Sequence, residues 1–391
     1  MRYLARTMSN SESYVESCGL PDRRPSPEEE AHDYVLGVQG LTMVFPNQRP
    51  LYNGVNLIVR EGEIIVIVGE SGIGKSVFLN LLVGLLEPTS GEIWYRPPHE
   101  PGSPHVDLPI HLLSEQDMTH IRTEVGIVFQ ESSLFDWMTV YENIALPLEH
   151  HPEIVDSWID RFLRFPGALC RHLSAAAQFL PPRLAAIHNL CAQGDTSAMR
   201  ILQEMLEESR ESVRAEVIDA SVMARMAEVR LDVVADRDKL PAQLSGGMKT
   251  RVGIARTLAL RPRVLLYDEP TAGLDPVMAK GIARAILELQ TEKIVSTSIV
   301  VTHDKELYWT LRDGARTRLV YLYRGQFIDE SGSVINDILT LPERPRAPVP
   351  PPAHPAGSRP ANLSEERRDP LRFISEFSAK GWRDAQQSGG K

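Results

Sequence analysis

The chain has 391 residues, of which 42% are apolar, so it can bury a substantial core in one large domain or two ordinary ones. Acidic and basic residues are mixed along its length with a formal net charge of -10, which argues against nucleic acid as a partner, because duplex binders carry a basic excess or stripe. The three cysteines, Cys18, Cys170 and Cys191, are widely spaced, which excludes a zinc cluster or a disulfide framework and indicates a reducing compartment.

Residues 1–33 are polar and contain the run Pro-Ser-Pro-Glu-Glu-Glu at 25–30. They lack the continuous apolar stretch of a secretory signal and bury too little apolar surface to become ordered, so we expect a flexible leader. Further along, the longest apolar runs, at 64–68 and 77–86, are far shorter than the roughly 20 residues that cross a membrane. Any membrane role therefore requires a partner subunit.

Residues 34–332 alternate between short apolar runs and helical patterns, which is typical of an α/β domain around a buried sheet. The first motif, GESGIGKS at 69–76, matches the phosphate-binding pattern G-x-x-x-x-G-K-[ST]. It lies between a strand-like run and an apolar helix, a context in which a chance glycine-rich turn is uncommon. Glycines let backbone N–H groups close around phosphate at a helix N-terminus. We expect this loop to bind ATP through Gly69, Glu70, Ser71, Gly72, Ile73, Gly74, Lys75 and Ser76.

Three later apolar runs end in polar residues: Gln130 after 125–129, Asp268 and Glu269 after 264–267, and His303 after 297–302. A single polar residue at a strand end is more often structural than catalytic. Two acids in this position are, however, the form in which a carboxylate is delivered to Mg²⁺ in phosphoryl-transfer enzymes. None of the three runs is decisive by itself.

The segment Leu244-Ser245-Gly246-Gly247-Met248 comes shortly before the two acids, and Pro270-Thr271-Ala272-Gly273-Leu274-Asp275 follows them. A Ser-Gly-Gly turn before a helix is common by itself. Together with the phosphate loop and the Asp-Glu strand, it resembles the signature motif of ABC-type ATPases, which other phosphate-loop classes lack. The resemblance covers roughly residues 35–332 and implies a P-loop ABC ATPase domain with a helical subdomain.

The resemblance implies the catalytic roles. Glu269 polarises the attacking water, and His303 senses the γ-phosphate of ATP. Mg²⁺ is held by Ser76, by Asp268 through water, and by Gln130, which matches the Q-loop glutamine of the family. In the family this loop links the metal to a groove that receives a short permease helix, and we expect Leu134, Phe135, Trp137 and Met138 to form that groove. Every catalytic landmark of the family is present, so we expect an active ATPase.

The resemblance also implies a head-to-tail homodimer that sandwiches two Mg-ATP. Ser245, Gly246 and Gly247 then bind the ATP held by the opposite subunit, and Asp275 communicates across the dimer. Phe45 lies where the family places an aromatic ring on adenine, although a strand residue in the core is an equal alternative.

Residues 149–207 depart from the compact family pattern, because helical patterns at 152–165 and 183–192 occupy a region where the family usually continues with one helix. We interpret them as a helical insertion in the helical subdomain. It either contacts a permease or regulator or is a neutral surface elaboration.

The sequence of residues 129–148, FQESSLFDWMTVYENIALPL, and that of residues 245–276 are similar to the corresponding segments of ATPases of Mla/MCE-type lipid transport systems. This implies an MlaE-like integral permease, an MCE-type lipid-binding protein, a small regulatory subunit, and a cytoplasmic location on the inner face of the plasma membrane. ATPases of importers for other small substrates share much of this sequence, so an importer ATPase is the alternative function. A soluble ABC protein or a regulatory scaffold is less favoured, because the chain has one cassette with intact catalytic residues.

Residues 333–360 are rich in proline, which favours extended polyproline II and predicts a linker. In the tail, 361–391, Asp369-Pro370 can begin a helix with the apolar cluster Leu371, Phe373, Ile374 and Phe377. The alternatives are a helix that docks on a partner and a disordered tail.

Overall fold

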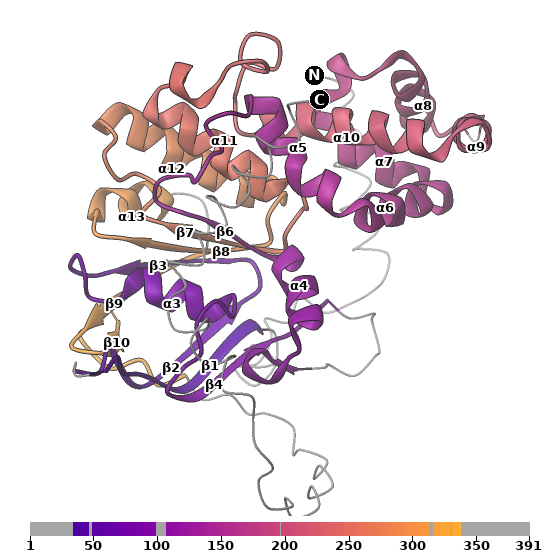
Figure 1. The fold of residues 1–391 in the computed structure, drawn as a ribbon. Coiled ribbons are helices and arrows are strands. Elements are labelled where there is room, and N and C mark those ends of the chain that lie inside the picture. The colour runs from indigo at the N-terminus through magenta and orange to yellow at the C-terminus, as the bar shows by residue number, and fades with distance from the viewer. Residues whose placement is uncertain are drawn as a thin grey trace, which may run out of the picture.

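The computed structural model describes residues 34–46, 49–98, 107–195, 197–312, 316–329 and 331–337. The expected leader at 1–33 and the expected tail at 361–391 lie outside these residues. The described chain forms two sheets with helices packed on them and a separate lobe of helices (Figure 1).

The larger sheet has six strands, of which all but the last in chain order run parallel. Their order across the sheet is β10 (Gln326–Ile328), β9 (Arg316–Tyr323), β3 (Glu63–Val68), β8 (Thr297–Thr302), β7 (Val264–Asp268) and β6 (Val125–Val128). Strands β3, β7 and β8 are buried along their whole length, which explains the apolar and β-branched runs that they contain. The α/β architecture expected from the sequence is confirmed.

The smaller sheet is antiparallel, in the order β2 (Tyr52–Arg60), β1 (Tyr34–Met43), β4 (Ser90–Tyr95) and β5 (Leu108–Pro109). Helix α3 (Lys75–Leu82) lies between the two sheets (Figure 1). Its Phe78 and Leu79 pack in one core cluster with Ile65 and Ile67 of β3.

The opposite face of the large sheet is covered by α11 (Gly246–Leu258), α12 (Pro276–Thr291) and α13 (Lys305–Arg312) (Figure 1). Alternate residues of β3, Ile64 and Val66, face this second cluster, which continues into the helical lobe. The period of two along β3 therefore divides one strand between two cores.

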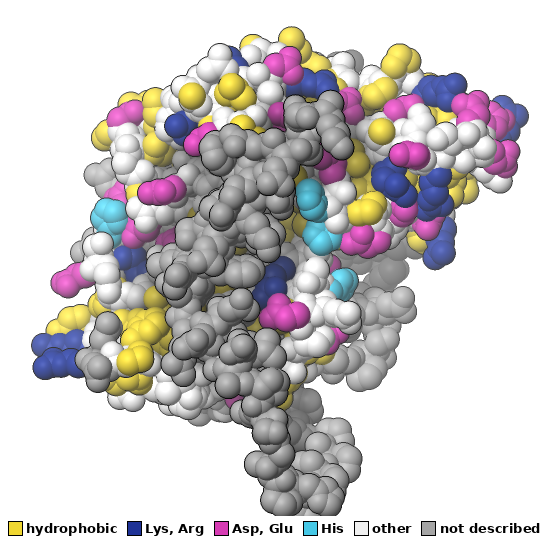
Figure 2. All heavy atoms as spheres, in the orientation of Figure 1, with side chains coloured by type: hydrophobic (Ala, Val, Ile, Leu, Met, Phe, Trp, Pro, Cys, Tyr) yellow, Lys and Arg dark blue, Asp and Glu magenta, His cyan; other side chains and the backbone are white. Residues whose placement is uncertain are grey.

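Helix α4 (Glu115–Glu124) lies beside β6, and its Met118 and Ile121 pack in the cluster that contains α3 and the smaller sheet. The helical lobe contains α5 (Val140–His150), α6 (Pro152–Arg164), α7 (Pro166–Leu173), α8 (Pro182–Ala192), α9 (Ser197–Glu208) and α10 (Arg210–Glu228). Of the helices expected within 149–207, the two predicted runs correspond to α6 and α8. Helices α7 and α9 lie outside the two predicted runs, and α7 is short and begins directly after α6. Charged side chains of both signs gather over this lobe in Figure 2, as on a surface that faces solvent.

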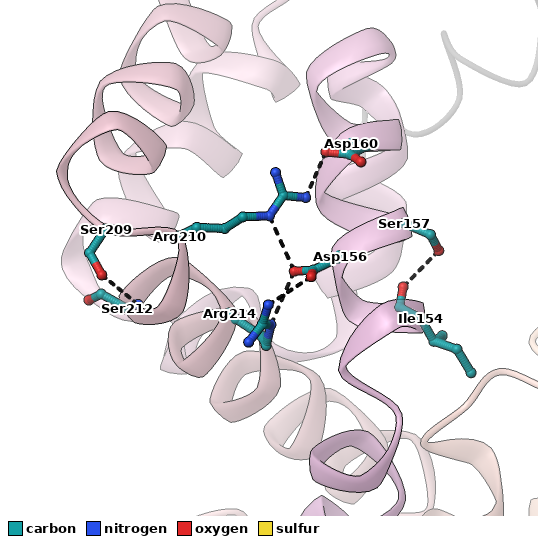
Figure 3. A network of polar contacts seen from close by, with 8 residues as sticks. All are labelled: Ile154, Asp156, Ser157, Asp160, Ser209, Arg210, Ser212 and Arg214. Carbon is teal, nitrogen blue, oxygen red and sulfur yellow. Dashed lines mark hydrogen bonds and ion pairs between the residues drawn. The ribbon is translucent and has the colours of Figure 1, made fainter.

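Ion pairs fasten the insertion to α10 (Figure 3). Arg214 makes two hydrogen bonds to Asp156 of α6, at 3.1 and 2.7 Å, and Arg210 reaches Asp160 at 2.9 Å. On the inner side of α6, Val155, Ile159 and Phe162 recur at helical spacing and are buried. The insertion is therefore a packed part of the domain.

Residues 333–337, which the sequence analysis placed in the linker, lie against the domain. The Ile335 N–H donates to the carbonyl of Phe327 at 2.8 Å, and Asp337 accepts from Arg318 at 2.9 Å. The packed domain thus extends to Asp337, because backbone and charged partners are available on β10 and β9. Within the described ranges, no helix combines the length and the apolar character needed to cross a membrane.

Candidate active site

The loop at 69–76 turns sharply from β3 into α3. Gly72 and Gly74 adopt φ values of +78° and +109°, which side chains disfavour, and Gly74 caps the first turn of α3. The hydroxyl of Tyr52, from β2, donates to the carbonyl of Gly74. A Cβ atom at Gly74 would meet that hydroxyl at 3.2 Å. Tyr52 therefore fixes the loop from outside, a contact that the sequence analysis missed because β2 carries no motif.

Lys75 is curled into this loop and is only 5% exposed. Its ammonium donates to the carbonyls of Gly69 and Glu70 at 2.9 and 3.0 Å, and its Nζ lies 3.1 Å from a carboxylate oxygen of Glu269. All three partners are oxygen acceptors, as phosphate oxygens are. The ammonium is thus held at the mouth of the loop by contacts that phosphate can replace.

Ser76 and Asp268 form the pair expected to hold Mg²⁺. The Ser76 hydroxyl donates to Asp268 Oδ1 at 2.8 Å. Burial raises the pKa of Asp268, and the neighbouring carboxylate of Glu269 adds to this rise. Such a pair favours a cation, and the hydroxyl and carboxylate oxygens are ligands that suit Mg²⁺. Among the described residues, no group of three or more His, Cys, Asp or Glu is arranged to hold a metal ion by itself.

Glu269 and His303 meet at the ends of β7 and β8. His303 donates its backbone N–H to Glu269 Oε2 at 3.1 Å, and its Nδ1 lies 2.8 Å from the same oxygen. Glu269 has a φ of +47°, and its backbone N–H donates to the carbonyl of Val301 at 2.9 Å. A non-glycine residue in this region costs about 1–3 kcal/mol and persists only where neighbours hold it. The strained backbone aims the carboxylate between Lys75 and His303.

Gln130 is exposed and lies two residues after the end of β6 at Val128. Strand β6 pairs with β7, which carries Asp268. After it, Ser132 and Ser133 both adopt positive φ values. Their carbonyls accept from the guanidinium of Arg256, on α11, at 2.9 and 2.8 Å. The loop after Gln130 is therefore fastened to the helix that begins at the signature segment.

Ser245 and Asp275 each cap a helix. The Ser245 hydroxyl accepts from the Met248 N–H at 3.3 Å, and the Asp275 carboxylate accepts from the Val277 N–H at 2.9 Å. Ser245 and Gly246 are exposed, whereas Gly247 is buried. Helix α11, which begins at the signature segment, lies across the large sheet from α3 (Figure 1). These residues are thus not gathered with Lys75 within one chain.

Phe45 follows β1 and is half-buried, packed against the core cluster that contains Tyr52 and Phe78. This position fits the alternative of a core aromatic. Its stacking on adenine stays a prediction.

Taken together, the phosphate loop after β3, the buried acids after β7 and the signature segment on α11 define an ATP-binding α/β domain of the ABC type. The chain belongs to the ABC transporter family, whose model matches residues 52–272. The position of the match includes the phosphate loop, the signature segment and both acids.

Several curated proteins are similar to this chain. The probable ribonucleotide transport ATP-binding protein mkl of Mycobacterium tuberculosis H37Rv is 30% identical over 78% of this chain and 65% of its own length. The methionine import ATP-binding protein MetN of Carboxydothermus hydrogenoformans is 28% identical over 79% of this chain and 68% of its own. The phosphonates import ATP-binding protein PhnC of Wolinella succinogenes is 29% identical over 75% and 82%. The matched region thus spans about two thirds of the first relative.

Among solved structures, cbiO1 from Clostridium perfringens, described as part of the ABC transporter complex cbiONQ, matches with a TM-score of 0.50 and 24% identity. The match covers 76% of this chain and 87% of that chain. This likeness supports the fold.

Replacing Tyr52 by phenylalanine is expected to loosen the phosphate loop. The ring keeps its edge contact with Phe78, at 6.0 Å between centroids, but the hydrogen bond to Gly74 is lost. A net hydrogen bond is worth about 1 kcal/mol, so we expect the Kd for ATP to rise roughly fivefold. Titration calorimetry with ATP measures this change. Tyr321→Phe, whose ring packs in the other core cluster, is the control, and equal affinities for both variants would contradict the role of Tyr52.

Proposed function

We propose that this chain is the ATP-hydrolysing subunit of a membrane transporter and works as a head-to-tail homodimer. The observation that carries the proposal is the convergence of Lys75, Ser76, Asp268, Glu269 and His303 from three separate segments of the chain. Phosphoryl transfer needs this set: a cation for the phosphates, oxygen ligands for a metal and a carboxylate for water.

Each residue then has a defined task. Lys75 exchanges its carbonyl partners for phosphate oxygens, and Ser76, Asp268 and Gln130 would hold Mg²⁺, which neutralises phosphate charge when bound. Glu269 accepts a hydrogen bond from the attacking water and thereby orients it. His303, already 2.8 Å from Glu269, contacts the transferred phosphate and keeps that carboxylate in place.

Hydrolysis by the purified full chain tests this proposal. Phosphate release from ATP should require Mg²⁺ and stop when the metal is chelated. If neither the chain alone nor the chain with its permease releases phosphate, the proposed activity is refuted.

The homodimer is supported by a surface that one chain leaves uncovered. Ser245 and Gly246 are exposed, and beside them Val277, just after Asp275, is 81% exposed. A polar hollow of about 380 Å³ lies next to this surface, lined by Thr271, Ala272, Gly273, Leu274, His303 and Asp304. A second copy that brings its signature segment to the phosphate loop would cover these residues.

Two substrate classes are consistent with the chain. The sequence of residues 129–148 and 245–276 supports lipid transport through an MlaE-like permease, with an MCE-type lipid-binding protein and a small regulatory subunit. The relatives from Carboxydothermus and Wolinella, which are named as methionine and phosphonates importers, favour import of a small polar substrate instead. In either case we place the chain on the cytoplasmic face of the membrane, bound through its permease. The permease that co-purifies with the chain decides between them.

The segment after Gln130 is the proposed contact with that permease. Asn143, fully buried on α5, holds Phe135 and Met138 by hydrogen bonds of its amide to their carbonyls, at 3.2 and 3.0 Å. Trp137, between them, is 59% exposed. A clamped loop with an exposed tryptophan is suited to anchor a partner helix.

A hollow of about 310 Å³ lies close to this segment, where α4, β6, α5 and α11 meet. Its lining includes Leu85, Pro147 and Arg256. Leu134, Phe135, Trp137 and Met138, which we expected from the sequence to form the groove for a permease helix, are not part of the lining. Arg256 joins the two features, because it lines the hollow and also holds Ser132 and Ser133. The proposed contact therefore combines the exposed Trp137 with this hollow.

The double substitution Trp137→Ala with Met138→Asp is expected to uncouple ATP hydrolysis from transport. ATP binding by the isolated chain should stay within about twofold, because neither residue touches the phosphate loop. Permease association and transport should both fall by roughly tenfold or more, as for loss of a hot-spot residue. Co-purification with the permease and transport in reconstituted vesicles measure the two effects.

Trp309→Ala is the matched control, because Trp309 on α13 is 58% exposed and lies away from this loop. Unchanged co-purification of the double variant would overturn the contact site. If the unaltered chain co-purifies only with a permease for a small polar substrate, the lipid assignment is wrong while the ATPase assignment stands.

A further inference from the structure

A directed chain of hydrogen bonds runs from the segment after α11 into the insertion. The guanidinium of Arg261 lies 2.6 Å from Nδ1 of His172, on α7, and Nε2 of His172 lies 3.0 Å from the hydroxyl of Ser221, on α10. Ser221 in turn donates to the carbonyl of Val217 at 2.6 Å. A guanidinium only donates, so Nδ1 must accept and Nε2 must carry the proton. The chain of bonds therefore requires a neutral imidazole in one tautomer.

The surroundings of His172 keep its ring in that state. The side chain is 2% exposed and is flanked by Trp158 and Phe162 of α6, with ring centroids at 4.6 and 5.3 Å. The charged groups that face it are Arg161, Arg225 and Arg261. Burial, followed by the charges of Arg261 and Arg225, holds the pKa of His172 well below its ordinary value near 6.5.

A second arginine completes this cluster. Arg225, on α10, is buried and pairs with Glu228 at 2.8 Å, and its Nη2 lies 3.4 Å from the backbone carbonyl of His172. Glu228 also faces Arg261. The cluster is therefore mainly cationic, and His172 is the group that gives Arg261 a neutral acceptor.

Arg261 lies at the single connection between α11 and β7. It adopts a φ of +58°, its N–H donates to the carbonyl of Leu258 at 2.9 Å, and Pro262 follows before β7 begins at Val264. A non-glycine residue with this φ is strained and is held by its contacts. The signature segment begins the helix on one side of Arg261, and Asp268 ends the strand on the other. A shift at this connection would displace both.

We propose that His172 is a positioning residue through which the helical insertion holds Arg261 and thereby sets the signature helix relative to the strand that carries Asp268 and Glu269. The insertion is then an input to the ATPase, because any partner that moves α7 changes the support of Arg261. This inference rests on the proposed hydrolysis of ATP. It assigns a role to residues 149–207, which the compact family pattern lacks.

Two substitutions at His172 test the proposal in the full chain. Phenylalanine keeps an aromatic ring but removes the acceptor, whereas asparagine is smaller but places an amide oxygen near the position of Nδ1. We expect His172→Phe to lower kcat by roughly tenfold with the KM for ATP within about twofold, since misplacement far from the chemistry acts mainly on turnover. His172→Asn should keep kcat within about threefold of the unaltered chain.

A purely structural role predicts the reverse order, because phenylalanine fills the buried site and asparagine leaves a cavity. Equal or higher kcat for His172→Phe than for His172→Asn, with both variants folded by thermal unfolding, would overturn the proposal. Ser221→Ala is the second test if His172→Phe does not fold: it removes the acceptor for Nε2–H and should lower kcat by about twofold to fivefold. An unchanged kcat for Ser221→Ala would also count against the proposal.

The pH dependence of stability gives a readout that needs no activity. His172 stays neutral in the folded chain but protonates near pH 6.5 when unfolded, so protons favour the unfolded state. The free energy of unfolding should therefore decrease as the pH falls below about 6.5, and this part of the decrease should be missing in His172→Asn. Identical pH profiles would refute a buried neutral His172. If the unaltered chain shows this profile but releases no phosphate, the proposed function fails while the buried contact stands.

Discussion

Replacing Glu269 by glutamine is expected to leave ATP binding intact and to lower hydrolysis by roughly 100-fold or more, the effect of losing a positioned base. Glutamine keeps the volume and one oxygen but has no charge. The side chain would no longer attract Lys75, now at 3.1 Å, or orient water as an anion. Because ATP then stays uncleaved, the ATP-bound dimer should accumulate. Phosphate release and size-exclusion chromatography with ATP measure the two effects.

Glu207→Gln is the control, because Glu207 is exposed on α9 and its replacement changes the net charge by the same amount. Near-normal hydrolysis by Glu269→Gln, measured with the permease present, would show that another group activates the water. Such a result would leave the phosphate loop assignment untouched.

The parts of the fold that the sequence predicted are those with local signals. Strands β3 and β7 contain continuous apolar runs because both faces of the large sheet are covered, and such runs are visible without any knowledge of partners. The phosphate loop carries its glycines because positive φ values at Gly72 and Gly74 are a local requirement. Asp268 ends the buried strand β7 and Glu269 follows it, so both acids could be recognised from the apolar run before them.

Contacts between distant segments were not predictable in this way. Tyr52 lies on β2, whereas Gly74 lies in the phosphate loop. Arg256 on α11 contacts Ser132 and Ser133, which lie far before it in the sequence. Each side chain alone is ordinary for its element. Only packing brings it to its partner, so no spacing in the sequence marks it.

The polar cluster of the insertion shows the same limit. His172 and Arg261 are separated by four further α-helices along the chain, α8 to α11, and each looks like a surface residue of an amphipathic segment. The sequence indicated that helices were inserted, from their apolar periodicity, but could not say that one of them supplies an acceptor to the segment before β7. That relation depends on how α7 packs on α10.

Removing the ammonium of Lys75 by substitution with alanine is expected to weaken nucleotide binding itself. Lys75 begins α3, and its side chain is held against the carbonyls of Gly69 and Glu70, at the mouth of the loop. A hydrogen bond to a charged group contributes about 1.5–3 kcal/mol, so the Kd for ATP should rise by roughly 10- to 100-fold. Titration calorimetry with ATP and Mg²⁺ measures this directly.

Lys280→Ala is the matched control for Lys75→Ala, because Lys280 is an exposed lysine on α12 and its loss removes the same charge. Its Kd for ATP should stay within about twofold of the unaltered chain, since exposed charges contribute little. Loss of Lys75 also leaves the Glu269 carboxylate without its ammonium partner, so hydrolysis should fall even at saturating ATP. Lys75→Ala should thus lose both binding and turnover, whereas Glu269→Gln loses turnover alone. If Lys75→Ala bound ATP as tightly as Lys280→Ala, the loop at 69–76 would not be the phosphate site.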